Sequence, residues 1–158
     1  MFRPLRRKSR EIDTEAAESL LMHERRGVLA VNGDDGYPYA VPIDYIYDRE
    51  AHRIIFHGAR AGYKFEALRA SDKVCFTVYG NETIKKEIWA PYVQSVVIFG
   101  RCHMIEDEVA ATELLRRLAR KYYPDEQTIE DGIAKNGKAA AVFEIEIEHL
   151  CGKEIHEK

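Results

Sequence analysis

Residues suited to binding a phosphate group gather in the stretch RIIFHGARAGYKFEALR, which begins at Arg53. A short apolar run, typical of a buried strand, ends there in His57 and Gly58. Gly62 and Lys64 follow at the expected start of a helix. Glycines allow a backbone to approach a ligand closely, and a helix N-terminus favours an anion. With the charge of Lys64 added, the stretch predicts a phosphate site at the end of a strand.

The same residues also allow a plainer interpretation. Gly58 and Gly62 could be ordinary loop glycines. Lys64 could be a solvated helix residue and His57 a hydrogen-bonded histidine of the core. Glycine spacing alone is a weak signal, so the residues leave both interpretations open. A further role for His57 would be proton transfer, because neutral imidazole titrates in the useful pH range. Arg60 could supply a second positive charge to a phosphate.

Six strands and about three helices are expected to position this stretch. Asp13 is a suitable N-cap for an amphipathic helix, and Gly27 would end that helix. The pair Asp35 and Gly36 tolerates the positive φ angles of a tight hairpin turn. The expected helices span residues 14–25, 62–70 and 107–124. The expected strands span residues 27–32, 37–48, 52–59, 73–80, 95–106 and 139–150.

Strands outnumber helices and are joined mostly by hairpins, which favours a mainly β (α+β) fold with an antiparallel sheet. A closed barrel would also remove exposed sheet edges. We therefore expect a six-stranded antiparallel β-barrel with flanking helices. Residues 80–92, which include Trp89, have no strand pattern, and residues 125–138 are polar with little patterning. One domain is expected at 12–158, after a solvated basic arm at 1–11.

The composition is that of an ordinary globular protein. Of its 158 residues, 46% are hydrophobic and 32% charged, and a net charge of −3 argues neither for nor against a nucleic-acid partner. No apolar run approaches the roughly 20 residues of a membrane helix. The basic start MFRPLRRKSR lacks the apolar segment of a secretory signal, so we expect a cytoplasmic protein whose arm aids solubility. Neither the three cysteines nor the six histidines have ligand spacing, so no metal site is expected.

Several segments, in their order along the chain, resemble one family. These segments are RRKSREI, GDDGYPYAVPIDYIYD, IIFHGARAGYK, KVCFTV, QSVVIFGRCHMIE, KYYP and a last strand that runs into HLCGK. They are similar to the FMN-binding split-barrel family, which includes pyridoxamine 5'-phosphate oxidases and nitroimidazole-resistance (Nim-type) proteins. The Nim-type branch is the nearer of the two. The resemblance implies a six-stranded antiparallel split barrel that forms a homodimer, with FMN at the subunit interface.

Matched residue by residue, the resemblance also implies where a flavin would bind. The segment 39–44 resembles the strand whose backbone runs along the flavin ring. His57 and Gly58 match the strand end beside the ribityl phosphate, and Ala59 follows them. The residues of the segment taken as ring contacts are Tyr39, Val41, Pro42, Ile43 and Asp44.

The remaining implied contacts include two departures from the family. Tyr63 and Lys64 match an Arg-Lys pair that holds the phosphate in the oxidases. Because the first residue is tyrosine here, Arg60 is the candidate for the missing charge. Ser95 matches a glutamine that reaches the flavin from the partner subunit. Trp89 would either wall a substrate pocket over the flavin or pack at the interface for stability.

The implied function is an FMN-dependent oxidoreductase that reduces a small electrophilic compound, such as a nitroaromatic, with His57 as the catalytic proton donor. The oxidases end in a longer tail with an Arg-x-His motif and a tryptophan. This chain ends in HLCGKEIHEK, so pyridoxamine phosphate is not the expected substrate. A pyridoxamine 5'-phosphate oxidase-related enzyme stays an alternative. Another alternative is a flavin- or haem-binding sensor or carrier without turnover.

Overall fold

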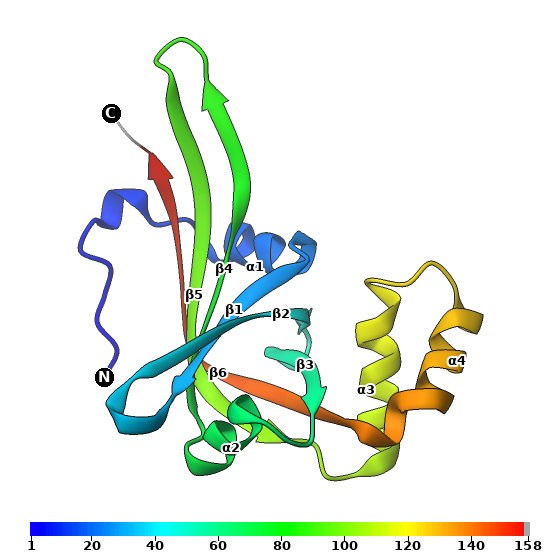
Figure 1. Ribbon diagram of the computed structural model, residues 1–158. Coiled ribbons are helices and arrows are strands. Elements are labelled where there is room, and N and C mark those ends of the chain that lie inside the picture. The colour runs from blue at the N-terminus through cyan, green and yellow to red at the C-terminus, as the bar shows by residue number, and fades with distance from the viewer. Residues whose placement is uncertain (157–158) are drawn as a thin grey trace.

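Six antiparallel strands close into a barrel in the order β1-β2-β3-β6-β5-β4 (Figure 1). The computed structural model describes residues 1–156; Glu157 and Lys158, at the end of the expected domain, lie outside the described residues. The strands are β1 (Arg26–Asn32), β2 (Pro38–Asp48), β3 (Arg53–Ala59), β4 (Lys73–Lys85), β5 (Ala90–Met104) and β6 (Ala140–His156). The helices are α1 (Thr14–His23), α2 (Tyr63–Ala70), α3 (Glu108–Arg120) and α4 (Glu126–Asn136). The predicted antiparallel barrel with flanking helices is confirmed.

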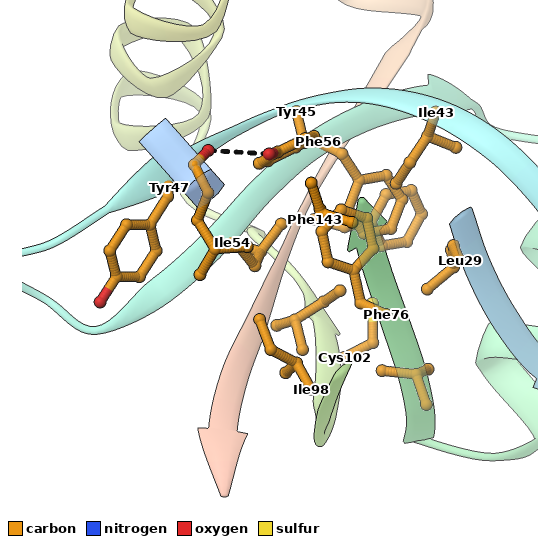
Figure 2. Packing of buried hydrophobic residues seen from close by; sticks show 14 of the residues in the cluster. Leu29, Ile43, Tyr45, Tyr47, Ile54, Phe56, Phe76, Ile98, Cys102 and Phe143 are labelled. Atoms are coloured by element: carbon orange, nitrogen blue, oxygen red, sulfur yellow. Dashed lines mark hydrogen bonds between the residues drawn. The ribbon is translucent and has the colours of Figure 1, made fainter. Parts of the chain in front are cut away.

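Aromatic rings fill the inside of the barrel (Figure 2). The rings of Tyr45 and Phe76 meet edge to face with centroids 4.9 Å apart, and those of Phe56 and Phe143 stack at 5.1 Å. Each fully buried ring contributes roughly 1.5–3 kcal/mol by leaving water. The Tyr45 hydroxyl is also buried, and it donates a hydrogen bond to the Leu21 carbonyl at 2.7 Å. This bond anchors α1 to the barrel and satisfies a polar group that would be costly to bury alone.

The first helix begins as predicted but ends earlier, and Gly27 does not stop it. The Asp13 carboxylate caps α1 by accepting a hydrogen bond from the Ala16 N–H at 2.8 Å. The helix ends at His23, and Gly27 lies inside β1. A Cβ at Gly27 would lie 2.2 Å from Cζ of Phe76. The glycine is therefore explained by a ring that fills the barrel, a packing constraint that the local sequence does not reveal.

The prediction of irregular structure at residues 80–92 is wrong. β4 continues to Lys85 and β5 begins at Ala90, and these two residues pair with each other. The result is a long β4–β5 hairpin that projects beyond the barrel (Figure 1). Residues 81–89 are exposed, so no face of the hairpin tip alternates between buried and exposed side chains. Because the pattern that marks a strand comes from one buried face, the tip gave no such signal.

The polar stretch at residues 125–138 contains the helix α4, which the sequence pattern did not indicate. Asp125 caps the helix by accepting a hydrogen bond from the Thr128 N–H at 2.8 Å. Only Ile129 is buried, so the helix has almost no apolar stripe. Ion pairs attach α4 to α3, with Arg116 Nε 2.6 Å from Glu130 Oε1. The two helices form a hairpin beside the barrel (Figure 1).

The basic arm lies against the outside of β5 and β6. The ring of Phe2 stacks on Phe99 and His149 with centroid distances of 5.5 and 5.0 Å. The guanidinium of Arg10 donates to the His156 carbonyl at 3.0 Å. The long β6 continues past the predicted end at residue 150, because it pairs with β5 as far as His156. Along residues 1–156, no helix is long and apolar enough to cross a membrane.

Candidate functional site

A crevice opens where β2, β3 and α2 meet. It has a volume of about 320 Å³, within the range of roughly 300–1,000 Å³ that is usual for small-molecule sites. Five of the six residues that line it were expected to be site residues, and these five come from β2, β3 and the first turn of α2. The lining consists of Arg26, Pro42, Ile43, Asp44, His57 and Lys64.

Lys64 is a half-buried cation that has no anionic partner among residues 1–156. No ion pair or side-chain hydrogen bond of its ammonium occurs within residues 1–156, and Nζ lies 5.8 Å from the centroid of the Phe56 ring. Burial lowers the pKa of Lys64, since the charged form loses water and gains no compensating carboxylate. Gly58 makes room for this side chain, because a Cβ there would lie 3.1 Å from Lys64 Nζ. An anion placed here would stabilise the charge.

His57 stands at the mouth of the crevice, one residue before Gly58. Part of the residue is accessible to solvent. Protein atoms nevertheless surround the ring closely enough that desolvation lowers the pKa of His57. The charge of Lys64 lowers the pKa further, while Asp44 opposes both effects. The ring is therefore neutral at pH 7, with one nitrogen as a donor and the other as an acceptor.

Arg26 supplies the second cation of the crevice, a role for which the sequence suggested Arg60. Arg26 Nε lies 3.0 Å from Asp44 Oδ1 across the β1–β2 pair. Asp44 Oδ1 is buried, and no N–H within residues 1–156 is aligned for a hydrogen bond to it. The contact with Arg26 is therefore an ion pair, and Oδ1 can still accept a hydrogen bond from a ligand. Arg60 is exposed and points elsewhere, with Nη1 4.0 Å from the Met104 sulfur. It does not line the crevice.

The two tyrosines implied as flavin neighbours pack against each other beside the β1–β2 turn. The rings of Tyr39 and Tyr63 meet edge to face at 4.6 Å. The Tyr63 hydroxyl accepts a hydrogen bond from the Asp34 N–H at 2.7 Å. Neither ring lines the crevice. Tyr63 therefore fixes the turn against α2 and does not replace the arginine of the oxidases as a second charge.

The other expected site residues lie outside the crevice of this chain. Val41 packs towards the core, and Ala59 is exposed at the end of β3. Trp89 sits near the tip of the β4–β5 hairpin, where 80% of it is exposed. Ser95 is only 7% exposed, buried within its own chain on β5. Contacts of Trp89 or Ser95 with a flavin stay predictions that would require a partner subunit.

A second cavity adjoins the crevice and shares Asp44 and His57 with it. It lies between the α3–α4 hairpin and the barrel, and its volume is about 370 Å³. The sequence pattern did not indicate this cavity, because α4 itself carried no clear helical signal. Its remaining lining residues are Leu115, Leu118, Ala119, Tyr122, Tyr123, Thr128, Ile129, Gly132, Ile133, Asn136, Gly137 and Ala140.

Comparison with known proteins identifies the class to which this barrel and crevice belong. The family model for pyridoxamine 5'-phosphate oxidase matches residues 13–154. The chain belongs to this pyridoxamine 5'-phosphate oxidase-like family. The resemblance inferred from the sequence is thereby confirmed. No curated protein matches the chain.

Solved structures share the fold at low sequence identity. One is described as a 5-nitroimidazole antibiotic resistance protein from Bacteroides thetaiotaomicron; the TM-score is 0.77 at 19% identity, covering 91% of this chain and 85% of that one. An FAD-binding protein from Mesorhizobium loti has a TM-score of 0.66 at 24% identity, covering 92% and 97%. The flavocytochrome Anf3 from Azotobacter vinelandii has a TM-score of 0.65 at 24% identity, covering 89% and 66%. These similarities establish the fold alone.

Proposed function

We propose that the protein is an FMN-dependent oxidoreductase that acts as a homodimer and reduces a small electrophilic compound, such as a nitroaromatic. The observation that carries the proposal is the half-buried ammonium of Lys64, which no carboxylate of residues 1–156 pairs, in a crevice of suitable volume. A phosphate monoester is the anion that such a site at the start of a helix favours. The family match and the flavin-binding proteins among the structural neighbours support a flavin as the molecule that carries it.

The residues present fit FMN. Lys64 would hold the phosphate, and Gly58 leaves room beside the ammonium. Asp44 Oδ1 is a buried acceptor that receives no aligned hydrogen bond from residues 1–156, and a flavin ring carries an N–H group that could donate to it. The crevice therefore offers the Lys64 ammonium for the phosphate and the Asp44 carboxylate, beside Arg26, for the ring.

His57 is the candidate catalytic residue. When bound, FMN would supply the hydride or electron transfer that no protein side chain provides. His57 would form a hydrogen bond to the substrate and, in its protonated form, give up a proton to it. Because desolvation and the charge of Lys64 lower the pKa of His57, this ring releases its proton more readily than a fully solvated histidine does.

The homodimer is proposed because the chain exposes apolar surface that a second copy could cover. Four large apolar side chains of the β4–β5 hairpin are each more than half exposed. They are Tyr79, Ile84, Ile88 and Trp89. Apolar side chains gathered on a projecting element are typical of protein–protein contacts.

Reoxidation of the reduced flavoprotein tests the proposed reaction. The protein is reconstituted with FMN, reduced under anaerobic conditions with one equivalent of dithionite, and mixed with nitrobenzene while the flavin absorbance is followed. We expect the oxidised spectrum to return faster than for free reduced FMN. His57→Gln should slow the return about 100-fold, the usual contribution of a positioned acid. His103→Gln is the matched control, because His103 is exposed and outside the crevice.

Three outcomes would contradict the proposal. A protein that holds FMN but never passes electrons to nitrobenzene would be a flavin carrier. A Soret band in the purified protein would indicate haem. Equal rates for His57→Gln and the wild type would remove His57 from the reaction.

A further inference from the structure

The cavity between the α3–α4 hairpin and the barrel has an apolar lining next to a polar end. Leu118 and Ile129 are buried in its walls, and half-buried Leu115 and Ile133 add further apolar surface. Thr128 and Asn136 add neutral polar groups. Such a mixture, mostly apolar with a few polar groups, is usual for a site that binds a small organic molecule. We call this cavity the helix-hairpin chamber.

Charge restricts what the chamber can accept. Among its lining residues Asp44 is the one carboxylate, and neither lysine nor arginine contributes. The Asp44 charge is paired with Arg26, which lies outside the chamber in the neighbouring crevice. An anion would therefore lose water on entering and gain no cation. A phosphorylated substrate belongs beside Lys64 and not here.

The chamber and the crevice meet at two residues. Asp44 and His57 line both, so a molecule in the chamber would lie beside the same imidazole that faces the crevice. The two cavities thus provide adjacent places for two ligands of different chemistry. One place is cationic and suits a phosphate, and the other is apolar and suits an uncharged ring.

We propose that the helix-hairpin chamber binds the compound that is reduced, and that this compound is a neutral, flat aromatic molecule with a polar electron-accepting group. This inference rests on the proposed function. The ring packs between the α3–α4 hairpin and the barrel, and the polar group lies at the His57 end. The α3–α4 hairpin therefore sets substrate specificity, whereas β2, β3 and α2 bind the cofactor.

Gly132 is a lining residue at which a larger side chain can narrow the chamber. It lies on α4 in the chamber lining, and a Cβ added there would meet no atom within 4 Å. A larger side chain can therefore be introduced without a backbone clash. Replacing a glycine within a helix also removes a destabilising residue, so the variant should fold. Gly132→Phe consequently tests the chamber by filling it.

Binding of nitrobenzene to the flavin-free protein, followed by methyl NMR, tests this proposal without relying on turnover. We expect saturable shifts of the methyl groups of Leu115, Leu118 and Ile133. The anion 4-nitrobenzoate should bind at least tenfold more weakly. Gly132→Phe should weaken nitrobenzene binding at least tenfold. Ala134→Phe is the matched control, because Ala134 is exposed on the same helix but does not line the chamber.

A second blocking variant, Ala119→Leu on α3, provides an independent test if Gly132→Phe fails to fold. Wild-type affinity in either folded blocking variant, equal affinity for 4-nitrobenzoate, or shifts confined to methyl groups outside the chamber would overturn the proposal. Failure of the flavin proposal would be distinguishable. In that case nitrobenzene would still bind the chamber, while FMN would not load into the crevice.

Discussion

At the scale of single residues, the sequence indicated the principal cation and the principal histidine of the crevice but not the second cation. His57 and Lys64 lie close in the sequence, so a strand followed by a helix brings them together by local geometry alone. Arg26 reaches the crevice through the pairing of β1 with β2, opposite Asp44. The hairpin predicted at Asp35 and Gly36 is consistent with that pairing, but the residue types alone did not mark Arg26 as a site residue.

Asp48 is a buried carboxylate whose contribution to stability can be measured. Burial pushes its pKa up, but hydrogen bonds from Arg117, the Ala51 N–H and Arg53 outweigh burial and hold the pKa below its usual range. The Asp48 carboxylate lies 3.0 Å from Arg117 on α3 and 3.2 Å from Arg53 on β3. It therefore connects the helix hairpin to the barrel.

We predict that Asp48→Asn lowers the free energy of unfolding by about 2 kcal/mol at pH 7, because hydrogen bonds to charged groups are lost. Because the folded pKa is depressed, the stabilisation is present above the ordinary aspartate pKa and is lost as the pH falls through the folded value. Urea unfolding at pH 7 and at acid pH measures both effects. The control, Asp72→Asn, removes a partly exposed pair with Arg101 and should change little. Equal losses in the two variants would contradict this account of Asp48.

At the scale of elements, the sequence predicted those with one buried face. The barrel strands alternate between buried and exposed side chains, and α3 has a strong apolar stripe, so both were predicted. Ile129 is the one buried residue of α4, and residues 81–89 at the tip of the β4–β5 hairpin are all exposed. Neither segment therefore shows the periodic spacing of apolar residues that marks a helix or a strand. Both missed elements border proposed binding surfaces. An element whose face contacts a ligand or a partner, and not the core of its own chain, lacks the regular apolar pattern from which secondary structure is predicted.

Gly152 is a second case in which a contact between distant segments could not be predicted from the local sequence. It lies on β6, and a Cβ there would come within 2.6 Å of Ile12 and 3.0 Å of Ala17. The glycine allows α1 and the segment before it to pack directly on the strand. This contact joins residues far apart in the chain, so the sequence offered no local reason for a glycine there.

At the scale of the whole molecule, the proposed dimer gives Trp89 a measurable role. It is the single tryptophan of the chain and is 80% exposed in one copy. We predict a concentration-dependent dimer in sedimentation velocity, with tryptophan emission shifting to shorter wavelength as the dimer forms. Trp89→Ser should weaken the dimer at least tenfold, since exposed aromatic residues are common anchors of interfaces.

Val109→Ser is the comparison for the dimer experiment. Val109 is also 80% exposed but lies on α3, away from the β4–β5 hairpin, and its replacement should leave the dimer unchanged. A chain that stays monomeric at all concentrations, or a Trp89→Ser dimer as tight as the wild type, would argue against the hairpin as the interface.

The most direct test of the central claim compares FMN with riboflavin, which lacks the phosphate, in the wild type and in Lys64→Met. If Lys64 holds the phosphate, the wild type should bind FMN about tenfold to a hundredfold more tightly than riboflavin, as charged hydrogen bonds imply. That preference should largely disappear in Lys64→Met, while riboflavin affinity stays the same. Lys73→Met, which changes an exposed lysine outside the crevice, is the control. An undiminished preference for FMN in Lys64→Met would contradict the assignment of the phosphate site.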